Sequence, residues 1–298
     1  MLLADLCAGG GGFSWADGAV LWKLRVPRVL TALLSGASLA LAGAQMQGIF
    51  RNPLADPHIM GVSGGAGLGA AIAALAAGTT AGWFGGMTLA LSAFAGALGT
   101  SVLIVAVSSR VRSTTTLLIF GVMLGFIFSA VSSILQYSAR EESLKLFYSW
   151  MAGSFSGTRY GEIAGIAGAL LIGAILALRS GKGLDLILFG DDFAELSGAS
   201  VRAIRFRTML GASLIAATVT AFCGPVGFVG IIAPHLARRL TGTSRHRTVL
   251  PFSMLTGAFL ALCADILANL WKVPLPAGST LALIGIPLIL VILLRNRS

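Results

Sequence analysis

Carboxylates are the most versatile side chains in this sequence for binding or catalysis, and they gather in one short stretch. Four of the eleven acids, Asp185, Asp191, Asp192 and Glu195, lie within residues 184–200, which read LDLILFGDDFAELSGAS. Long apolar runs lie on both sides of it. The pattern is typical of a short amphipathic helix on the surface of a membrane protein. The chemistry expected there is recognition of a docked partner.

A P-loop and two common motifs of metal or redox sites are absent from the sequence. Lys182 follows Gly181, but Leu176 and Gly183 stand where a P-loop requires a glycine and a Ser or Thr. Neither HExxH nor CxxC occurs. His235 lies near two arginines with no carboxylate or nucleophile beside it, which favours an interfacial histidine over a catalytic base. We expect no catalytic residue, so the chain moves a solute without transforming it.

The cysteines give no sign of a metal site. Cys7, Cys223 and Cys263 are odd in number, far apart and inside or beside apolar runs. Such spacing fits neither a disulfide framework nor a zinc site. We interpret them as packing residues and predict no metal site.

Composition places these residues in a membrane. The 298 residues are 56% hydrophobic and 11% charged, with a mean hydropathy of +0.90, whereas about a quarter of an ordinary soluble domain is charged. Apolar segments of about 20 residues recur, each long enough to cross a bilayer as a helix. The expected fold is all-α, a polytopic integral membrane protein forming one domain over residues 1–298.

The net charge of +10 reflects topology, because the basic residues lie in loops between apolar runs and form no single patch for nucleic acid. Alternate loops divide them unequally between two sides, and the richer side is cytoplasmic by the positive-inside rule. Residues 184–200 and the C-terminus fall on that side. It holds 14 of the 21 basic residues: Arg51, Arg110, Arg112, Arg179, Lys182, Arg202, Arg205, Arg207, Arg238, Arg239, Arg245, Arg247, Arg295 and Arg297.

Nine complete spans are expected, starting just after Arg28. Residues 224–239 are rich in glycine and proline, which predicts a kinked span whose freed backbone groups face protein or a cavity. Asp265 lies near the external end of its span and is either a functional acid or a hydrogen-bond partner of a broken helix. The spans are residues 28–49, 61–77, 84–107, 114–137, 162–178, 208–223, 224–239, 249–270 and 279–294.

Three of these spans carry small residues at every fourth position, and the second of them has Gly61, Gly65 and Gly69, continued by Ala73 and Ala77. The first has Gly36, Ala40, Ala44 and Gly48, and we interpret this ridge as close helix packing. The span 114–137 has an equivalent ridge, with threonines at its cytoplasmic mouth, and here packing and the lining of a pathway are both open. That ridge consists of Gly121, Gly125, Ser129 and Ser133.

Four segments in chain order resemble the signatures of the FecCD-type permeases, the membrane subunits of ATP-binding-cassette (ABC) importers for ferric siderophores, haem and cobalamin. The resemblance covers nearly the whole chain from Leu21, and its NPLADP and GFVG-PH-R elements are specific. The segments are Arg25-Val26-Pro27-Arg28, GASLALAGAQMQGIFRNPLADPHIMGVSGGAGLGA, LFGDDFAELSGAS, and GPVGFVGIIAPHLARRLTG followed by SRHRTVLP.

The resemblance implies a ten-helix permease in the bacterial inner membrane, surrounded by lipid and working as a homodimer. Two cytoplasmic ATPases would bind ATP and Mg²⁺, and a periplasmic or lipid-anchored protein would bind the substrate. The chain itself would be no enzyme and hold no cofactor. The resemblance also implies a coupling segment that sits in a cleft of the ATPase, made of Gly190, Asp191, Asp192, Ala194, Glu195, Leu196 and Gly198.

Two further sets of residues follow from the resemblance. Arg25 and Arg28 match outward-facing arginines that meet acids of the binding protein, and Lys272 is a further docking candidate. The span 114–137 matches the helix that lines the translocation pathway. Its candidate pathway and gate residues are Thr114, Thr115, Gly121, Gly125 and Ser129.

The chain departs from the family pattern at three points. The first helix is missing or reduced to residues 1–8, with residues 1–20 as its remnant and an external loop. Asn269 stands where many members have Arg, and Val273 where they have Glu before the proline. Both changes put the second docking surface in question.

Two other functions are open on sequence grounds. An ion-coupled secondary transporter of a small solute would require charged residues in mid-span, of which this chain has almost none. A membrane-embedded enzyme would require a concealed catalytic or metal constellation. The sequence does not identify which chelate, haem or corrinoid is carried, nor whether the permease pairs with itself or with a different permease.

Overall fold

A computed structural model describes residues 1–9, 12–13, 17–76, 85–108, 110–111, 113–271 and 273–295. Almost all of these residues are helical. A two-residue antiparallel pairing of β1 (Ala8–Gly9) with β2 (Gly12–Phe13) follows the first short helix. The helices are α1 (Leu2–Cys7), α2 (Gly18–Val20), η1 (Leu21–Arg25), α3 (Val26–Phe50), η2 (His58–Val62), α4 (Ser63–Ala76), α5 (Gly85–Ser108), α6 (Thr114–Tyr137), α7 (Glu141–Met151), α8 (Tyr160–Ile187), α9 (Asp191–Leu196), α10 (Val201–Cys223), α11 (Val229–Thr241), α12 (His246–Asn269) and α13 (Ala277–Arg295).

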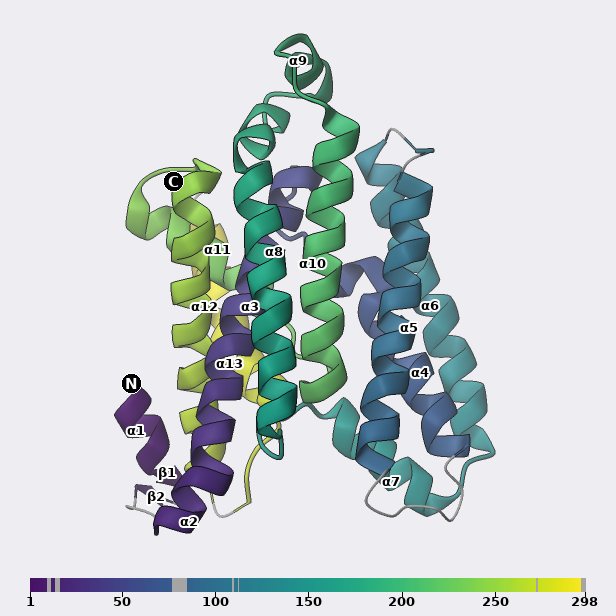
Figure 1. Ribbon diagram of the computed structural model, residues 1–298, viewed down its shortest axis with the longest axis vertical. Helices are drawn as coiled ribbons and strands as arrows, with labels where there is room; N and C mark the ends of the chain where they lie inside the picture. Colours follow the sequence, from purple (N-terminus) through teal and green to yellow (C-terminus); the bar gives the residue numbers. More distant parts are fainter. Residues whose placement is uncertain are drawn as a thin grey trace.

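The long helices run roughly parallel, and the two ends of the molecule differ (Figure 1). At one end the short helix α9 projects beyond the bundle, and the C-terminus lies toward this end. At the opposite end lie α2, the β1–β2 pairing and α7, which runs across the bundle. The expected cytoplasmic segments therefore share one end and the expected external segments share the other.

Seven helices within the described ranges are long and apolar enough to cross a membrane, which confirms the polytopic all-α prediction. Two of the nine expected spans differ from full-length apolar helices. Helix α11 has 13 residues, about 20 Å at 1.5 Å per residue, so it crosses only part of the bilayer. Helix α13 has a shorter apolar stretch, Ala277–Leu290.

Helix α11 is short because the backbone before it is not helical. Gly224 has φ 72° and Phe228 has φ 70°, and a positive φ interrupts a right-handed helix. The freed carbonyls bind protein donors, as expected: the Ser154 amide donates to the Cys223 carbonyl at 2.8 Å. The Trp150 indole donates to the Ala221 carbonyl at 3.2 Å. The break therefore lies against α7 and its following loop instead of lipid.

Helix α3 is the centre of one part of the bundle. It packs against α8, α10, α11 and α12, and 83% of its most apolar window is buried. Glycine allows the closest approaches: a Cβ at Gly36 would collide with the Gly257 carbonyl of α12, and one at Gly43 with the backbone of Gly230 in α11. The packing interpretation of the ridge that begins at Gly36 is confirmed.

Candidate functional site

Helix α9 is a separate projection formed by the acidic stretch. Gly190 precedes it with φ 120°, and Gly198 follows it with φ 82°. Side chains with a Cβ are strained in this region of backbone conformation, so these glycines permit the sharp entry and exit. Ala194 is fully buried beneath the helix. The residues predicted to form a coupling segment therefore build one turn-helix-turn unit.

Ion pairs fix α9 to the bundle. One oxygen of Asp191 pairs with the guanidinium of Arg205 on α10, and the other lies 3.7 Å from Arg51 at the end of α3. Arg205 is 7% exposed, so water screens its pair less than it would a surface pair. A displacement of α9 would therefore act on α3 and α10 together.

A third contact ties the preceding helix to α12. His246 Nδ1 lies 2.6 Å from Asp185 Oδ1, and the backbone amide of His246 donates to the same oxygen at 2.9 Å. His246 is buried, and a Cβ at Gly48 of α3 would lie 2.6 Å from its Nε2. Asp185 thus has a structural partner at the junction of α3, α8 and α12.

The outer surface of α9 carries large apolar side chains. Leu196 is 90% exposed and Phe189 is 76% exposed. The Phe189 and Phe193 ring centroids are 5.5 Å apart. Asp192 and Glu195 are exposed beside them. Exposed apolar groups rimmed by charge are typical of a surface that binds another protein.

The opposite end carries a buried charge cluster. Arg28 of α3 is 6% exposed, and its Nε lies 2.8 Å from Asp265 Oδ2 of α12. Its Nη2 lies 3.3 Å from Asp5 Oδ1 of α1 and donates to the Ala8 carbonyl at 3.0 Å. Burial and the neighbouring Asp265 raise the pKa of Asp5 above its ordinary value, whereas Arg28 lowers it. One cation therefore joins three helices through two carboxyl groups.

One serine–histidine contact needs to be distinguished from a catalytic pair. Residues 61–65, GVSGG, have G-x-S-x-G spacing, and Ser63 hydrogen-bonds to His58 Nδ1. Asp56 accepts from the His58 backbone amide at 2.8 Å instead of from the ring. Ser63 follows the π-helix η2, whereas a nucleophile elbow follows a strand. This cluster closes the turn into α4.

No group of three or more His, Cys, Asp or Glu side chains in the described ranges could hold a metal ion. The charged groups instead form pairs between helices, as at Asp185 and His246. At both ends of the bundle, charged side chains therefore connect neighbouring helices.

Comparison with known proteins decides the family. Residues 7–295 match the FecCD transport family. The chain belongs to the FecCD transport family. It is a multi-pass permease of the ABC importer type in the bacterial inner membrane.

The alignments with several relatives cover most of this chain and most of the relative. The vitamin B12 import system permease BtuC of Klebsiella pneumoniae is 36% identical over 305 residues, covering 99% of this chain and 90% of that protein. The uncharacterized ABC transporter permease YvrB of Bacillus subtilis is 35% identical over 282 residues, covering 93% and 79%.

The fold has solved counterparts. A metal-chelate type ABC transporter in an inward-facing conformation has a TM-score of 0.88 and 32% identity, covering 99% of this chain and 95% of the other. PsaBC from Streptococcus pneumoniae, at TM-score 0.62 and 16% identity, shares the fold alone.

The FecCD resemblance assigned docking to three basic residues, and the structure places them differently. Arg28 is wrong as an outward-facing contact, because it is buried and paired with Asp5 and Asp265. Arg25 is half-buried and donates to the Leu6 carbonyl at 2.8 Å, so its docking role stays a prediction. Lys272 lies outside the described residues. Asn269 donates to Asp265 and completes the buried cluster.

The candidate pathway residues of α6 separate into two faces. Gly121 and Gly125 pack against η2: a Cβ on Gly121 would lie 3.0 Å from Met60 Cα, and one on Gly125 would lie 3.2 Å from Gly61 Cα. Their role as pathway residues stays a prediction. The other candidates keep an exposed or half-exposed position, and they are Thr114, Thr115 and Ser129.

Sequence reasoning missed the long-range partners of these residues. Arg205 was interpreted only as a marker of the cytoplasmic interface, yet it holds Asp191. A signal was present, because Arg205 lies one turn into the helix after the acidic stretch. Asp265 had a signal too, as an ionisable residue in a span, but nothing in its spacing identified Arg28.

Proposed function

We propose that this chain is the permease subunit of an ATP-driven importer of a corrinoid. It works as a homodimer, with two cytoplasmic ATP-binding subunits and an external substrate-binding protein. The observation that carries the proposal is the exposed apolar and acidic surface of α9. A surface built in this way requires a partner, and the vitamin B12 permease relatives are 36% identical over nearly the whole chain.

Energy would enter the permease through α9. ATP binding closes the ATPases, and their movement pushes on Phe189, Phe193 and Leu196. Because Asp191 pairs with Arg205 and Arg51, a displacement of α9 is transmitted directly to α10 and α3. The Asp185–His246 pair passes it to α12. The pathway helices then tilt from outward-open to inward-open.

The transported solute is held by shape, because the described spans offer few unpaired charges. Corrinoids are favoured by the named import systems among the relatives. An iron chelate or haem is the second candidate, since the solved structure at 32% identity is a metal-chelate type transporter. An ion-coupled carrier is disfavoured, because the intramembrane acid Asp265 is already paired with Arg28.

Association with an ATPase tests the coupling role. Gly190→Arg and Glu195→Lys should each reduce co-purification of a co-expressed ATP-binding subunit at least about tenfold, because a buried charge mismatch at an interface costs several kcal/mol. Membrane insertion should be unchanged. Glu142→Lys is the matched control, an exposed acid at the opposite end on α7. If Glu195→Lys co-purifies as much of the ATP-binding subunit as the wild type does, α9 is not the coupling element.

Substrate identity requires a separate measurement. Uptake of cyanocobalamin should be restored when the permease and its cognate ATPase and binding protein replace those of a cobalamin-import mutant. If the purified binding protein retains a ferric chelate or haem instead, the corrinoid assignment is wrong while the permease assignment stands.

A further inference from the structure

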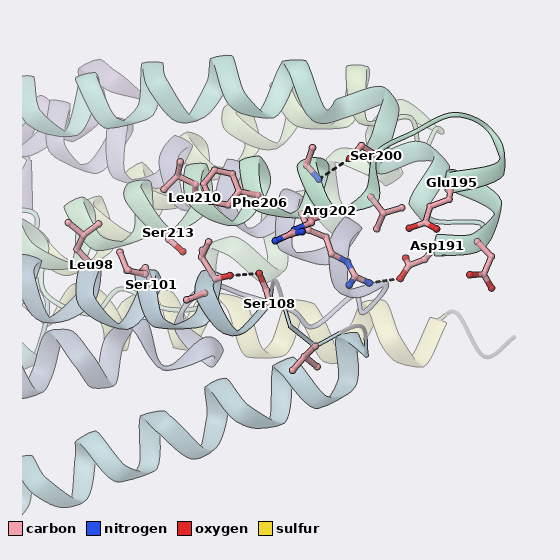
Figure 2. A pocket seen from close by; sticks show the side chains of 18 residues that line it. Leu98, Ser101, Ser108, Asp191, Glu195, Ser200, Arg202, Phe206, Leu210 and Ser213 are labelled. Carbon is pink, nitrogen blue, oxygen red and sulfur yellow. Dashed lines mark hydrogen bonds and ion pairs between the residues drawn. The ribbon is translucent and has the colours of Figure 1, made fainter.

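A cavity of about 1030 Å³ opens between α5 and α10, beneath α9 (Figure 2). Ligand pockets in proteins are about 300–1,000 Å³, so this one could hold a large ligand. Its deeper wall is apolar and includes Leu98, Val102 and Leu210. Val102 is 58% exposed and Phe206 is 51% exposed, so apolar side chains face the opening.

The depth of the cavity fits one leaflet of a bilayer. On α5 its wall extends from Leu98 to Ser108, and on α10 from Val201 to Ser213. These lengths are about 15 and 18 Å at 1.5 Å per residue, against about 15 Å for half of a hydrocarbon core of roughly 30 Å. Ser108 and Val201 are also the cytoplasmic ends of membrane spans. The cavity therefore extends from the cytoplasmic interface toward mid-membrane.

The mouth of the cavity carries both signs of charge. Arg205 and Asp191 pair with each other there, and Arg202 and Glu195 lie on different sides of this pair. Asp192 also lines the cavity. In the ranges that the structure describes, no hydrogen bond or ion pair engages these three side chains. A ligand with a phosphate and an ammonium group would satisfy both signs, whereas a simple anion would leave the acids unpaired.

We propose that this cavity is a binding site for an aminophospholipid of the cytoplasmic leaflet, such as phosphatidylethanolamine. The phosphate binds Arg202, the ammonium binds Asp192 and Glu195, and one acyl chain lies along Leu98, Val102 and Leu210. Because the headgroup contacts α9, the lipid would hold the coupling helix against α5 and α10. The proposal does not rest on the identity of the transported solute or on the presence of the ATPase.

Native mass spectrometry of the purified full-length chain tests the site by titration with dioleoyl phospholipids. Phosphatidylethanolamine should bind more tightly than phosphatidylcholine, whose quaternary ammonium has no N–H, and more tightly than phosphatidylglycerol, which has no cation. Arg202→Glu should weaken phosphatidylethanolamine binding about tenfold or more, because one charge-assisted hydrogen bond is lost. Val102→Trp should abolish it by filling the apolar wall.

Two variants elsewhere control for general effects on lipid binding. Arg179→Glu changes an exposed arginine in the second half of α8, and Leu171→Trp enlarges an exposed apolar residue of the same helix. Both should bind phosphatidylethanolamine like the wild type. Equal affinity for the three lipids, or equal losses in the control variants, would overturn the site. A third result would also overturn the site: a permease dimer that retains no lipid and that dissociates with Val102→Trp. A second copy of the chain would then fill the cavity.

Discussion

Helices α3 and α6 carry the same pattern of small residues at every fourth position, yet they lie in opposite environments. The most apolar window of α3 is 83% buried, and that of α6 is 17% buried. On α3, Gly36 of the ridge meets the backbone of α12, and the neighbouring Gly43 meets the backbone of α11. On α6 only Gly121 and Gly125 are covered, while Ser129 and Ser133 are exposed. A small-residue ridge therefore predicts close approach without specifying how much of the helix is covered.

The two helices also differ in their charges. Near its start, at the external end, helix α3 carries the buried Arg28, which pairs with two carboxyl groups. Its cytoplasmic end is followed by Arg51, which pairs with Asp191 of α9. Helix α6 has no charged residue along its length. We therefore expect substitutions in α3 to reduce stability, and substitutions on the exposed face of α6, the proposed pathway wall, to reduce transport.

Arg28→Met should have the largest effect on stability. It leaves the carboxyl groups of Asp5 and Asp265 buried without their cation, and breaking a buried pair in this way costs about 3–5 kcal/mol. Thermal unfolding in detergent, followed by tryptophan fluorescence, measures the loss. Unfolding of the variant at the wild-type temperature would show that the cluster contributes nothing to the stability of α3 in the bundle.

A triple variant separates charge from packing. Asp5→Leu, Arg28→Met and Asp265→Leu together remove both the cation and its partners, and apolar replacement of a whole buried ion cluster is often neutral. The triple variant should therefore recover most of the stability lost by Arg28→Met alone. If it is less stable than the single variant, the cluster stabilises by its charges.

Gly43→Ala should have the next largest effect. Its Cβ would collide with the backbone of Gly230, and overpacking of this kind costs about 1–3 kcal/mol. Gly125→Ala on α6 should cost less, because its nearest neighbour would be at 3.2 Å. Gly168→Ala on α8 meets nothing within 4 Å and should be neutral or gain up to about 1 kcal/mol of helix propensity. The same unfolding assay ranks them, and equal costs at Gly43 and Gly125 would remove the distinction between the helices.

Much of this architecture was predictable from local sequence. The span expected at residues 114–137 is α6 itself, because Ser113 caps it by accepting from the Thr116 amide at 3.2 Å. The acidic stretch 184–200 is predicted as a short surface helix, and its central part forms one, α9, between Gly190 and Gly198. Its first residues, 184–187, instead continue α8. These features depend on neighbours in the chain, which is the information that periodicity and capping contain.

The rest depends on residues far apart in the sequence. Nothing near Arg28 indicates that Asp5 and Asp265 will surround it, so it was assigned to an external surface. The ridge of α6 could not reveal that η2 covers its first half, because a spacing of four fits a helix neighbour and a pathway equally well. The cavity between α5 and α10 also depends on how these two helices pack relative to each other, which the sequence of neither helix determines alone.

Ser129→Leu should have the smallest effect on stability and a large one on transport. Ser129 is exposed, and its hydroxyl makes no hydrogen bond within the described residues, although its carbonyl accepts one from the Ser133 hydroxyl at 3.0 Å. Stability should therefore change by no more than about 0.5 kcal/mol. A bulky side chain on the open face of α6 should nevertheless lower substrate uptake, because that face is the candidate pathway wall. Ala164→Leu is the control, a small exposed residue of α8. Equal uptake by both variants would indicate that the exposed face of α6 contacts lipid or a second copy of the chain and does not line the pathway.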